Sequence, residues 1–406
     1  MISTAVIFCG GYGKRLGNIT KKIPKPMVLV AKKPFLEHLL LQLKKNGIKK
    51  FFFLIGYKSK KITDYFKDGK KWKVNIEYDY NHPNFETEYR LSAIKDRIKN
   101  DFLLLYSDNY CPFNLKKNYK FFKENKSLIT LNVCKKNIGN VKFINNNLVN
   151  YSSTRKKDHY FVDIGYMIIK KELLTYLNYN NRKFSTLIDL LSKKKKVSAI
   201  QNVHSYLSIS DPKRLLLTRK YFNNRNIVLI DRDGVLNKNN DKFFYVRNLK
   251  ELFFNYKVIN ILKKFPDIKY ICITNQAGIA TGEVKLGNLI KINAAIKKKL
   301  REYKINILEY FISPHHFKSN NFFRKPNPGN FIKASKKYQF LLDKTFYIGD
   351  DLRDIQAAYN SDTNCYFVGN RNKNFYKFKK EYSNIIPGHL SSVLKKFNEK
   401  RKDSSN

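Results

Sequence analysis

Two aspartates follow directly on a short apolar run in the second half of the chain. The run is 227–230 (IVLI), and Asp231, Asp233 and Gly234 come after it. Such a run predicts a buried strand, and strand ends are where an open α/β sheet presents reactive groups. In an extended segment the side chains at i and i+2 point the same way, which suits a metal ion and a phosphoryl group. The competing interpretation is a turn that is merely acidic.

Three later segments place further polar groups after apolar runs and favour a site over an acidic turn. They are 270–278 (YICITNQAG), 324–329 (RKPNPG) and 345–354 (TFYIGDDLRD). Their order resembles the haloacid dehalogenase (HAD) phosphatase superfamily. Within it, DRDGVLN, TNQAGIA, RKPNPG and IGDDLRDIQAA look like the branch containing histidinol-phosphatase and D-glycero-manno-heptose 1,7-bisphosphate 7-phosphatase.

The HAD resemblance implies a role for each polar side chain of these segments. Asp231 is implied as the nucleophile that forms an aspartyl-phosphate. Asp233 is implied to protonate the leaving alkoxide and then to activate water. Thr274, Asn275 and Lys325 are implied to bind the phosphoryl group, with Lys325 offsetting charge in the transition state.

The same resemblance implies a Mg²⁺ site. Asp231, Asp350 and the backbone carbonyl of Asp233 would coordinate the ion, and Asp351 or Asp354 would support them. Oxygen ligands of this kind are those that Mg²⁺ prefers.

A zinc loop that this branch often carries before Arg-Lys-Pro is not expected here. Of its four Cys and His ligands only His315 remains, and one ligand cannot hold tetrahedral zinc. We therefore expect no zinc, and a loop ordered by the packing of Phe317, Phe322 and Phe323. Beside the loop, Arg324 is implied to read the distal phosphate and the sugar.

A second site is indicated at the start of the chain. The apolar run 4–9 (TAVIFC) ends in the glycine-rich 10–16 (GGYGKRL), and 23–28 (IPKPMV) follows. Glycine permits positive φ and close approach of the backbone, so amide groups of such a loop can point at phosphate oxygens. The two segments resemble sugar-1-phosphate nucleotidyltransferases, whose signature is Gly-Gly-x-Gly-x-Arg-Leu followed by Pro-Lys-Pro.

That resemblance implies which residues bind the nucleotide. Gly10, Gly11 and Gly13 would hold it, while Arg15 and Lys25 would act on the triphosphate and the sugar phosphate. Charge on the attacked phosphate must be offset during nucleotidyl transfer, which cations and a divalent metal can do.

Asp108 follows the apolar run 102–106 and matches the metal-binding aspartate of this family. The resemblance therefore implies that Asp108 binds a Mg²⁺ ion in the N-terminal domain. The chain also departs from the family pattern. Residues 85–90 (FETEYR) replace a glycine-rich segment, and Ser208 stands where a second metal aspartate is usual. Asp163 is expected near the sugar or as a substitute ligand.

The elements that must position these residues alternate as in α/β proteins. We expect helices at 35–46, 90–98 and 212–222 and strands at 51–56, 74–78 and 102–106. The fold class is α/β with two domains, a Rossmann-like nucleotidyltransferase sheet at 1–222 and a HAD-type Rossmannoid parallel sheet at 227–385. Residues 386–406 are expected to form a polar C-terminal tail.

Composition limits the classes of protein that the chain can be. Its 406 residues, 43% of them hydrophobic, suffice for two cores, and its net charge is +48. Lysines are spread along the whole chain, which a genome rich in A and T explains without a nucleic-acid or membrane partner. Five cysteines form no CxxC pair and no apolar run reaches ~20 residues, so we expect reduced thiols, no membrane span and a cytoplasmic protein.

We therefore expect a bifunctional enzyme of nucleotide-sugar synthesis, serving surface polysaccharide. Its substrates would be a sugar bisphosphate, a sugar 1-phosphate and a nucleoside triphosphate, with Mg²⁺ in both domains. One alternative is an active phosphatase joined to a degenerate nucleotidyltransferase that acts as a sensor or scaffold. Another is nucleic-acid end repair, against which the chain lacks a Lys-x-Asp-Gly motif. The base, the sugar, its anomer and the oligomeric state remain open at this stage.

Overall fold

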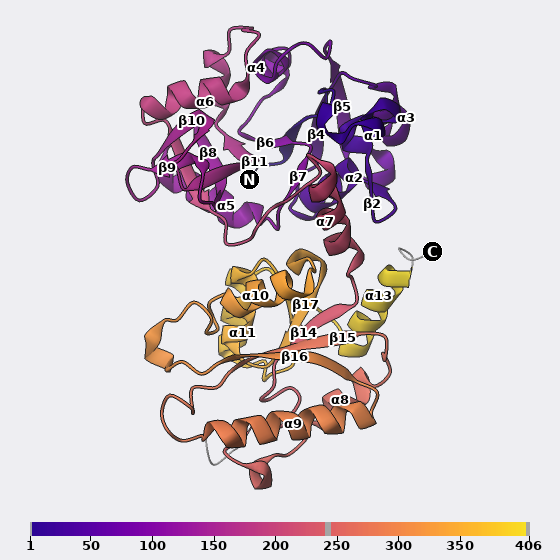
Figure 1. Cartoon of the computed structure of the whole chain (residues 1–406), viewed down its shortest axis with the longest axis vertical. Coiled ribbons are helices and arrows are strands. Elements are labelled where there is room, and N and C mark those ends of the chain that lie inside the picture. The colour runs from indigo at the N-terminus through magenta and orange to yellow at the C-terminus, as the bar shows by residue number, and fades with distance from the viewer. Residues whose placement is uncertain (1, 240–244, 403–406) are drawn as a thin grey trace. The chain divides into compact units, whose positions relative to one another are not determined.

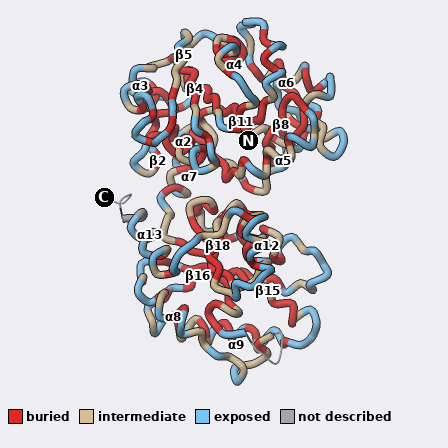
Figure 2. Tube along the Cα trace, turned by 180° about the vertical axis from the view of Figure 1, so that it is seen from behind, coloured by how far each residue is buried: buried red, intermediate tan, exposed pale blue. Residues whose placement is uncertain are grey.

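The computed structural model describes residues 2–239 and 245–402. The chain forms two compact units, Met1–Arg219 and Lys220–Asn406 (Figure 1). The predicted boundary at residue 222 therefore lies just inside the second unit, within α7 (Pro212–Asn223). In both units the buried residues gather along the central strands (Figure 2).

The first unit is built on a nine-stranded mixed sheet. Strand β1 pairs in parallel with β4 and β6, and β4 pairs in parallel with β5. On the other side β11 runs antiparallel to β6. The strands are β1 (Thr4–Phe8), β4 (Lys50–Ile55), β5 (Asn75–Tyr80), β6 (Phe102–Tyr106), β8 (Ile129–Lys135), β9 (Gly139–Phe143), β10 (Val149–Lys156), β11 (Phe161–Ile169) and β12 (Val197–Gln201).

Helices and short strands complete this unit. Apolar side chains of α6 pack on one sheet face in a cluster that includes Val6, Phe52 and Leu104. The helices are α1 (Asn18–Lys22), α2 (Phe35–Lys45), α3 (Lys60–Phe66), α4 (Thr87–Ser92), α5 (Leu115–Asn125) and α6 (Phe184–Lys193). The short strands are β2 (Leu29–Val30), β3 (Lys33–Pro34), β7 (Asn109–Tyr110) and β13 (Leu207–Ser208).

The helix predicted at 90–98 is wrong in its bounds. Helix α4 already ends at Ser92, and a 3-10 turn at Lys95–Arg97 follows. So short a helix is not stable alone, and tertiary contacts hold it. Glu88 and Arg90 supply such contacts, because both are buried and bind groups outside the helix.

The second unit is a five-stranded sheet in the order β16-β15-β14-β17-β18, and every pairing is parallel. Helices α8 and α9 lie on one face, and α10 and α11 lie on the other (Figure 1). The strands are β14 (Ile227–Ile230), β15 (Lys269–Asn275), β16 (Asn306–Ser313), β17 (Phe346–Gly349) and β18 (Asn364–Phe367). The helices are α8 (Tyr256–Leu262), α9 (Leu286–Glu302), α10 (Gly329–Tyr338), α11 (Leu352–Asn360), α12 (Lys373–Glu381) and α13 (Leu390–Lys402).

The polar tail predicted at 386–406 is wrong over most of its length. Leu390 and Leu394 of α13 are buried in the core of the second unit, and Val393 and Phe397 pack against it. These positions follow the i, i+3, i+4, i+7 spacing of an amphipathic helix, which the polar composition of the segment conceals. Residues 403–406 of the predicted tail lie outside the described residues.

All five cysteines are buried, and none of them is joined in a disulfide. Within residues 2–239 and 245–402, no helix combines the length and the apolar character needed to cross a bilayer.

Candidate active sites

A cavity of about 370 Å³ opens at the ends of β14, β15 and β17 in the second unit. Parallel strands present their carboxyl ends at one edge of the sheet, so segments far apart in the sequence meet there. The cavity is lined by every residue predicted for the phosphatase site, namely Asp231, Asp233, Thr274, Asn275, Arg324, Lys325 and Asp350.

Lys325 lies buried at the centre of this site. Its Nζ is 2.5 Å from Asp231 Oδ2 and 2.8 Å from Asp354 Oδ1, and it donates to the Tyr347 hydroxyl at 2.8 Å. Burial alone would lower the pKa of Lys325, but the carboxylates of Asp231 and Asp354 raise it. The ammonium therefore stays charged. Sequence reasoning missed Tyr347, although it lies in the predicted strand.

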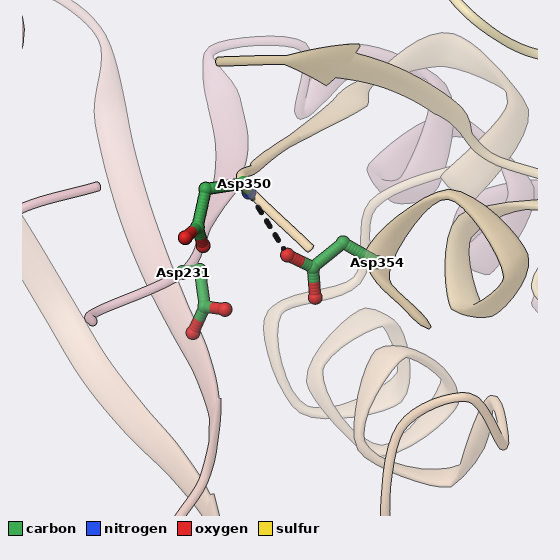
Figure 3. Close-up of side chains that lie close together, drawn as sticks. All are labelled: Asp231, Asp350 and Asp354. Atoms are coloured by element: carbon green, nitrogen blue, oxygen red, sulfur yellow. Dashed lines mark hydrogen bonds between the residues drawn. The ribbon is translucent and has the colours of Figure 1, made fainter. Parts of the chain in front are cut away.

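Asp231, Asp350 and Asp354 form a carboxylate cluster in which one oxygen of each residue lies within 4.8 Å of one oxygen of the other two (Figure 3). Burial raises the pKa of Asp231 well above its ordinary value, and the charges of Asp354 and Asp350 add to this effect. Burial and the charge of Asp354 raise the pKa of Asp350 to about 6. Carboxylates crowded in this way fit a hard divalent cation, which would relieve their repulsion.

Asp354 is the most constrained member of the cluster. Its Oδ2 accepts hydrogen bonds from the backbone N–H groups of Asp350 and Asp351, both at 3.0 Å (Figure 3). Its Oδ1 pairs with Lys325. Asp351 begins α11 as its N-cap and pairs with Arg353. Asp231 accepts from the backbone N–H of Arg232 and from Lys325, and Asp350 accepts from Asn239, so both have fewer donors than Asp354. That Asp231 and Asp350 hold a metal ion stays a prediction.

The carboxylate of Asp233 points into a buried network. Arg232, which is fully buried, donates to both of its oxygens, with Nη2 at 2.9 Å from Oδ2. Gln276 donates to Oδ2 at 2.7 Å and Asn237 to Oδ1 at 2.9 Å. Burial would raise the pKa of Asp233, but these donors lower it. Sequence reasoning missed Arg232, and an arginine between two aspartates beside an apolar strand was the available signal.

Asn275 and Arg324 are held by backbone groups. Asn275 exchanges two hydrogen bonds of 3.0 Å with the backbone of Lys325, and so fixes the loop that carries the lysine. Arg324 is buried and donates to the His315 carbonyl at 3.2 Å. Burial lowers the pKa of Arg324, as does the neighbouring charge of Arg353.

The loop before Arg324 has local ring contacts but no buried aromatic core. Phe317 stacks on His316 with 4.1 Å between centroids, and Phe322 meets Phe323 edge to face at 5.6 Å, while the three phenylalanines are 55%, 49% and 39% exposed. Hydrogen bonds also hold the loop, because Gly329 N–H donates to the Phe322 carbonyl and the Asn330 amide donates to the Phe323 carbonyl, both at 2.9 Å.

A second cavity, of about 680 Å³, lies in the first unit. The glycine loop forms part of its wall, and residues 83–87 form another part. Its lining includes every residue predicted for the nucleotidyltransferase site, namely Gly10, Gly11, Gly13, Arg15, Lys25 and Asp108.

Lys25 and Asp108 form an ion pair in the wall of this cavity, with Lys25 Nζ 2.5 Å from Asp108 Oδ2. The segment expected to carry a second metal aspartate lies beside them, because Ser208 pairs with Asn109 and Ile209 N–H donates to the Asp108 carbonyl. Serine thus occupies the predicted place without supplying a charge.

The glycine loop is packed against an arginine that sequence reasoning missed. A Cβ on Gly10 would come within 2.1 Å of Arg90 Nη1, so any other residue there would displace the Arg90 guanidinium. Arg90 is buried and donates to the carbonyls of Phe85 at 2.9 Å and His82 at 2.9 Å. It therefore ties the 81–86 loop to the underside of the glycine loop.

Asp163 is not among the residues that line the described cavity. Its Oδ1 accepts a hydrogen bond of 2.8 Å from Gly165 N–H. Burial raises the pKa of Asp163 to about 7.

Two family models match different parts of the chain, and the second match begins inside the first unit. A nucleotidyl transferase family model matches residues 4–141, and a haloacid dehalogenase-like hydrolase model matches residues 186–368. Bifunctional protein GlmU of Methanococcus maripaludis is 40% identical over 104 residues, which are 26% of this chain and 24% of that protein. The D-glycero-alpha-D-manno-heptose 1-phosphate guanylyltransferase of Campylobacter jejuni is 37% identical over 127 residues, 31% of this chain and 55% of that enzyme. This chain thus spans about a quarter of the first relative and about half of the second.

The second unit has a relative that is covered more completely. The D-glycero-alpha-D-manno-heptose-1,7-bisphosphate 7-phosphatase of Photorhabdus laumondii is 32% identical over 145 residues, which are 34% of this chain and 78% of that enzyme. Through its C-terminal unit the chain therefore belongs to the haloacid dehalogenase-like hydrolase family that includes this phosphatase, and it joins that unit to an N-terminal nucleotidyl transferase domain.

Proposed function

We propose that the protein removes the distal phosphate of a heptose 1,7-bisphosphate and then joins the resulting heptose 1-phosphate to a nucleoside monophosphate. The observation that carries the first half is the buried Lys325 within a carboxylate cluster at strand ends. The second half is supported by the glycine loop with Lys25 and Asp108 in one cavity. Nucleoside triphosphate substrates and buried cysteines that form no disulfide fit a cytoplasmic enzyme.

In the phosphatase site, Asp231 attacks the phosphorus, and the bond to the sugar oxygen breaks. Asp233 gives its proton to the leaving oxygen, and an aspartyl-phosphate remains. Asp233 next takes a proton from water, whose oxygen attacks the phosphorus and releases inorganic phosphate. Lys325 offsets the negative charge on the phosphoryl oxygens throughout. Asp231 and Asp350 would hold Mg²⁺, which supplies further positive charge at these oxygens.

The surroundings of Asp233 set a requirement for this sequence of steps. Its carboxylate is held by Arg232, Gln276 and Asn237, which favour the charged form. Proton donation therefore requires that bound substrate loosen this network.

In the nucleotidyltransferase site, a phosphate oxygen of the sugar 1-phosphate attacks the α-phosphorus of the triphosphate, and pyrophosphate leaves. Arg15 and Lys25 bind the phosphates, and backbone amides of the glycine loop hold the nucleotide. Asp108 would hold Mg²⁺, which offsets charge on the attacked phosphate. Its pairing with Lys25 requires that the lysine move toward phosphate when the metal binds.

The test is phosphate release from D-glycero-D-manno-heptose 1,7-bisphosphate with Mg²⁺, followed by pyrophosphate release on adding each triphosphate. Asp231→Asn should abolish phosphate release, and chelation by EDTA should do so reversibly. Asp267→Asn, an exposed aspartate outside the cavity lining, is the matched control. Phosphate without pyrophosphate for any triphosphate would contradict the second half of the proposal, and absence of phosphate release would contradict the first half.

A further inference from the structure

Glu86 lines the N-terminal cavity with an unpaired carboxylate. Among the described residues its side chain makes no ion pair or hydrogen bond. The other carboxylate of the lining, Asp108, is paired with Lys25. Glu88, two positions further on, is buried and paired with Arg182. In a chain of net charge +48, a carboxylate left free in a cavity is a candidate acceptor for a ligand.

The backbone around Glu86 is fixed, so its carboxylate has a defined place. Glu86 N–H donates to Asn181 Oδ1 at 2.7 Å. Arg90 Nε donates to the preceding carbonyl, that of Phe85, at 2.9 Å. The Phe85 ring stacks on Tyr89 with 4.1 Å between centroids. A fixed backbone lowers the entropic cost of ordering the side chain when a ligand binds.

Charge divides the cavity into two regions. Lys14, Arg15 and Lys25 lie with the glycine loop and attract phosphates, whereas Glu86 repels them. Arg90 also lines the cavity, but its guanidinium is packed against Gly10 and bound to the carbonyls of Ile55, His82 and Phe85. A nucleotide bound with its phosphates over the glycine loop therefore places its base, not its phosphates, against residues 83–87.

The base best suited to a carboxylate is the one with two adjacent N–H donors. Guanine presents N1–H and the N2 amino group side by side, and one carboxylate can accept both in a bidentate pair. Cytosine and adenine present an amino group next to an acceptor nitrogen, and uracil presents one N–H between two carbonyls. Each of these would set an acceptor against a carboxylate oxygen, which is unfavourable.

We propose that Glu86 selects guanine nucleotides by accepting hydrogen bonds from N1–H and the N2 amino group. This inference rests on the proposed nucleotidyltransferase, whose base it specifies. Asn84 lines the same part of the cavity, and its Oδ1 accepts a hydrogen bond of 2.9 Å from the Tyr12 hydroxyl, whereas the carboxylate of Glu86 accepts no hydrogen bond from a side-chain or backbone donor among the described residues.

The test is calorimetric binding of GTP, ITP, ATP, CTP and UTP to the full chain with Mg²⁺ and without sugar phosphate, so that no turnover is needed. ITP lacks the N2 amino group. The wild type should bind GTP roughly 10- to 100-fold more tightly than ITP, as expected for loss of a hydrogen bond to a charged acceptor. In Glu86→Gln the two should bind within about threefold, since an amide offers one acceptor and one donor.

Glu124→Gln, an exposed glutamate outside the cavity lining, should keep the wild-type ratio. An unchanged GTP-to-ITP affinity ratio in Glu86→Gln, or tighter binding of any other triphosphate by the wild type, would overturn the inference.

A second assay, pyrophosphate release with heptose 1-phosphate, distinguishes failure of this inference from failure of the proposed function. Guanine-selective binding without pyrophosphate would refute the transferase alone, and pyrophosphate from a different triphosphate would refute the role of Glu86 alone.

Discussion

At the scale of single residues, the phosphatase site depends on how Lys325 is held. Its Nζ is shared among Asp231, Asp354 and the Tyr347 hydroxyl, and that hydroxyl donates in turn to the Ile273 carbonyl at 2.9 Å. Tyr347 is not among the residues that line the cavity, whereas Lys325 is. In the proposed mechanism Tyr347 is therefore a positioning residue, and Lys325 is the charged group that would meet the phosphoryl oxygens.

Lys325→Met should therefore lower kcat/KM for phosphate release by about 10² to 10³-fold, the range for removal of a group that stabilises transition-state charge. Tyr347→Phe should lower it by less, about 10-fold, because the charge remains but its orientation is less defined. Steady-state phosphate release measures both. An equal loss in the two variants would contradict the assignment of the charge to Lys325.

The buried carboxyl group of Asp163 should make the stability of the first unit depend on pH. Its pKa is raised by burial from 3.8 to about 7, so the folded state holds this proton more tightly than the unfolded state. The free energy of unfolding should therefore fall as pH rises from about 4 to about 7, and remain low above. Asp163→Asn removes this effect.

The advantage of Asp163→Asn over the wild type should grow by about 2 kcal/mol between pH 5 and pH 8, since one pKa unit corresponds to about 1.4 kcal/mol. Urea unfolding of the full chain can be followed by the fluorescence of Trp72, the single tryptophan, which lies in the first unit. A difference that does not vary with pH would show that Asp163 is not the titrating group.

Residues within short motifs could be predicted from the sequence, but the side chains that hold these residues in place could not. Asp231 and Asp350 each follow an apolar run, and a parallel sheet brings strand ends together. Lys325 was found through its motif, RKPNPG, which lies in a loop beyond β16. Arg232 and Arg90 were missed because their roles arise from contacts with segments distant in sequence, such as Gln276 and the carbonyl of Ile55.

At the scale of elements, the central strands and the helices at 35–46 and 212–222 were predicted, whereas α9 and the C-terminal helix were not. The central strands are continuous apolar runs, as expected when both faces of a parallel sheet are covered. Helix α13 is rich in lysine, and its apolar stripe appears only when positions are read at helical spacing. Composition alone therefore gave the wrong result at residues 390–402.

Leu394→Ala tests whether α13 is part of the fold. Removing a fully buried leucine should cost the second unit about 2–5 kcal/mol, whereas Lys395→Ala, an exposed neighbour, should cost less than about 0.5 kcal/mol. Loss of phosphatase activity in urea reports on the second unit, and Trp72 fluorescence reports on the first as an internal control. Equal stability of the two variants would show that the helix is dispensable.

At the scale of the whole molecule, the chain carries two chemically separate sites on two sheets. The product proposed for the phosphatase, a sugar 1-phosphate, is the substrate proposed for the transferase. Each site has its own buried or partly buried lysine paired with an aspartate, Lys325 with Asp231 and Lys25 with Asp108. A substitution in one site should therefore abolish one reaction and leave the other unchanged.

The most direct measurement is a time course of phosphate and pyrophosphate from heptose 1,7-bisphosphate, GTP and Mg²⁺ with Asp231→Asn, Lys25→Met and an equal mixture of the two. Asp231→Asn should yield neither product from the bisphosphate but pyrophosphate from heptose 1-phosphate. Lys25→Met should yield phosphate and no pyrophosphate, and the mixture should yield both. Phosphate from Asp231→Asn, or pyrophosphate at the wild-type rate from Lys25→Met, would contradict the account of two separate sites acting in sequence.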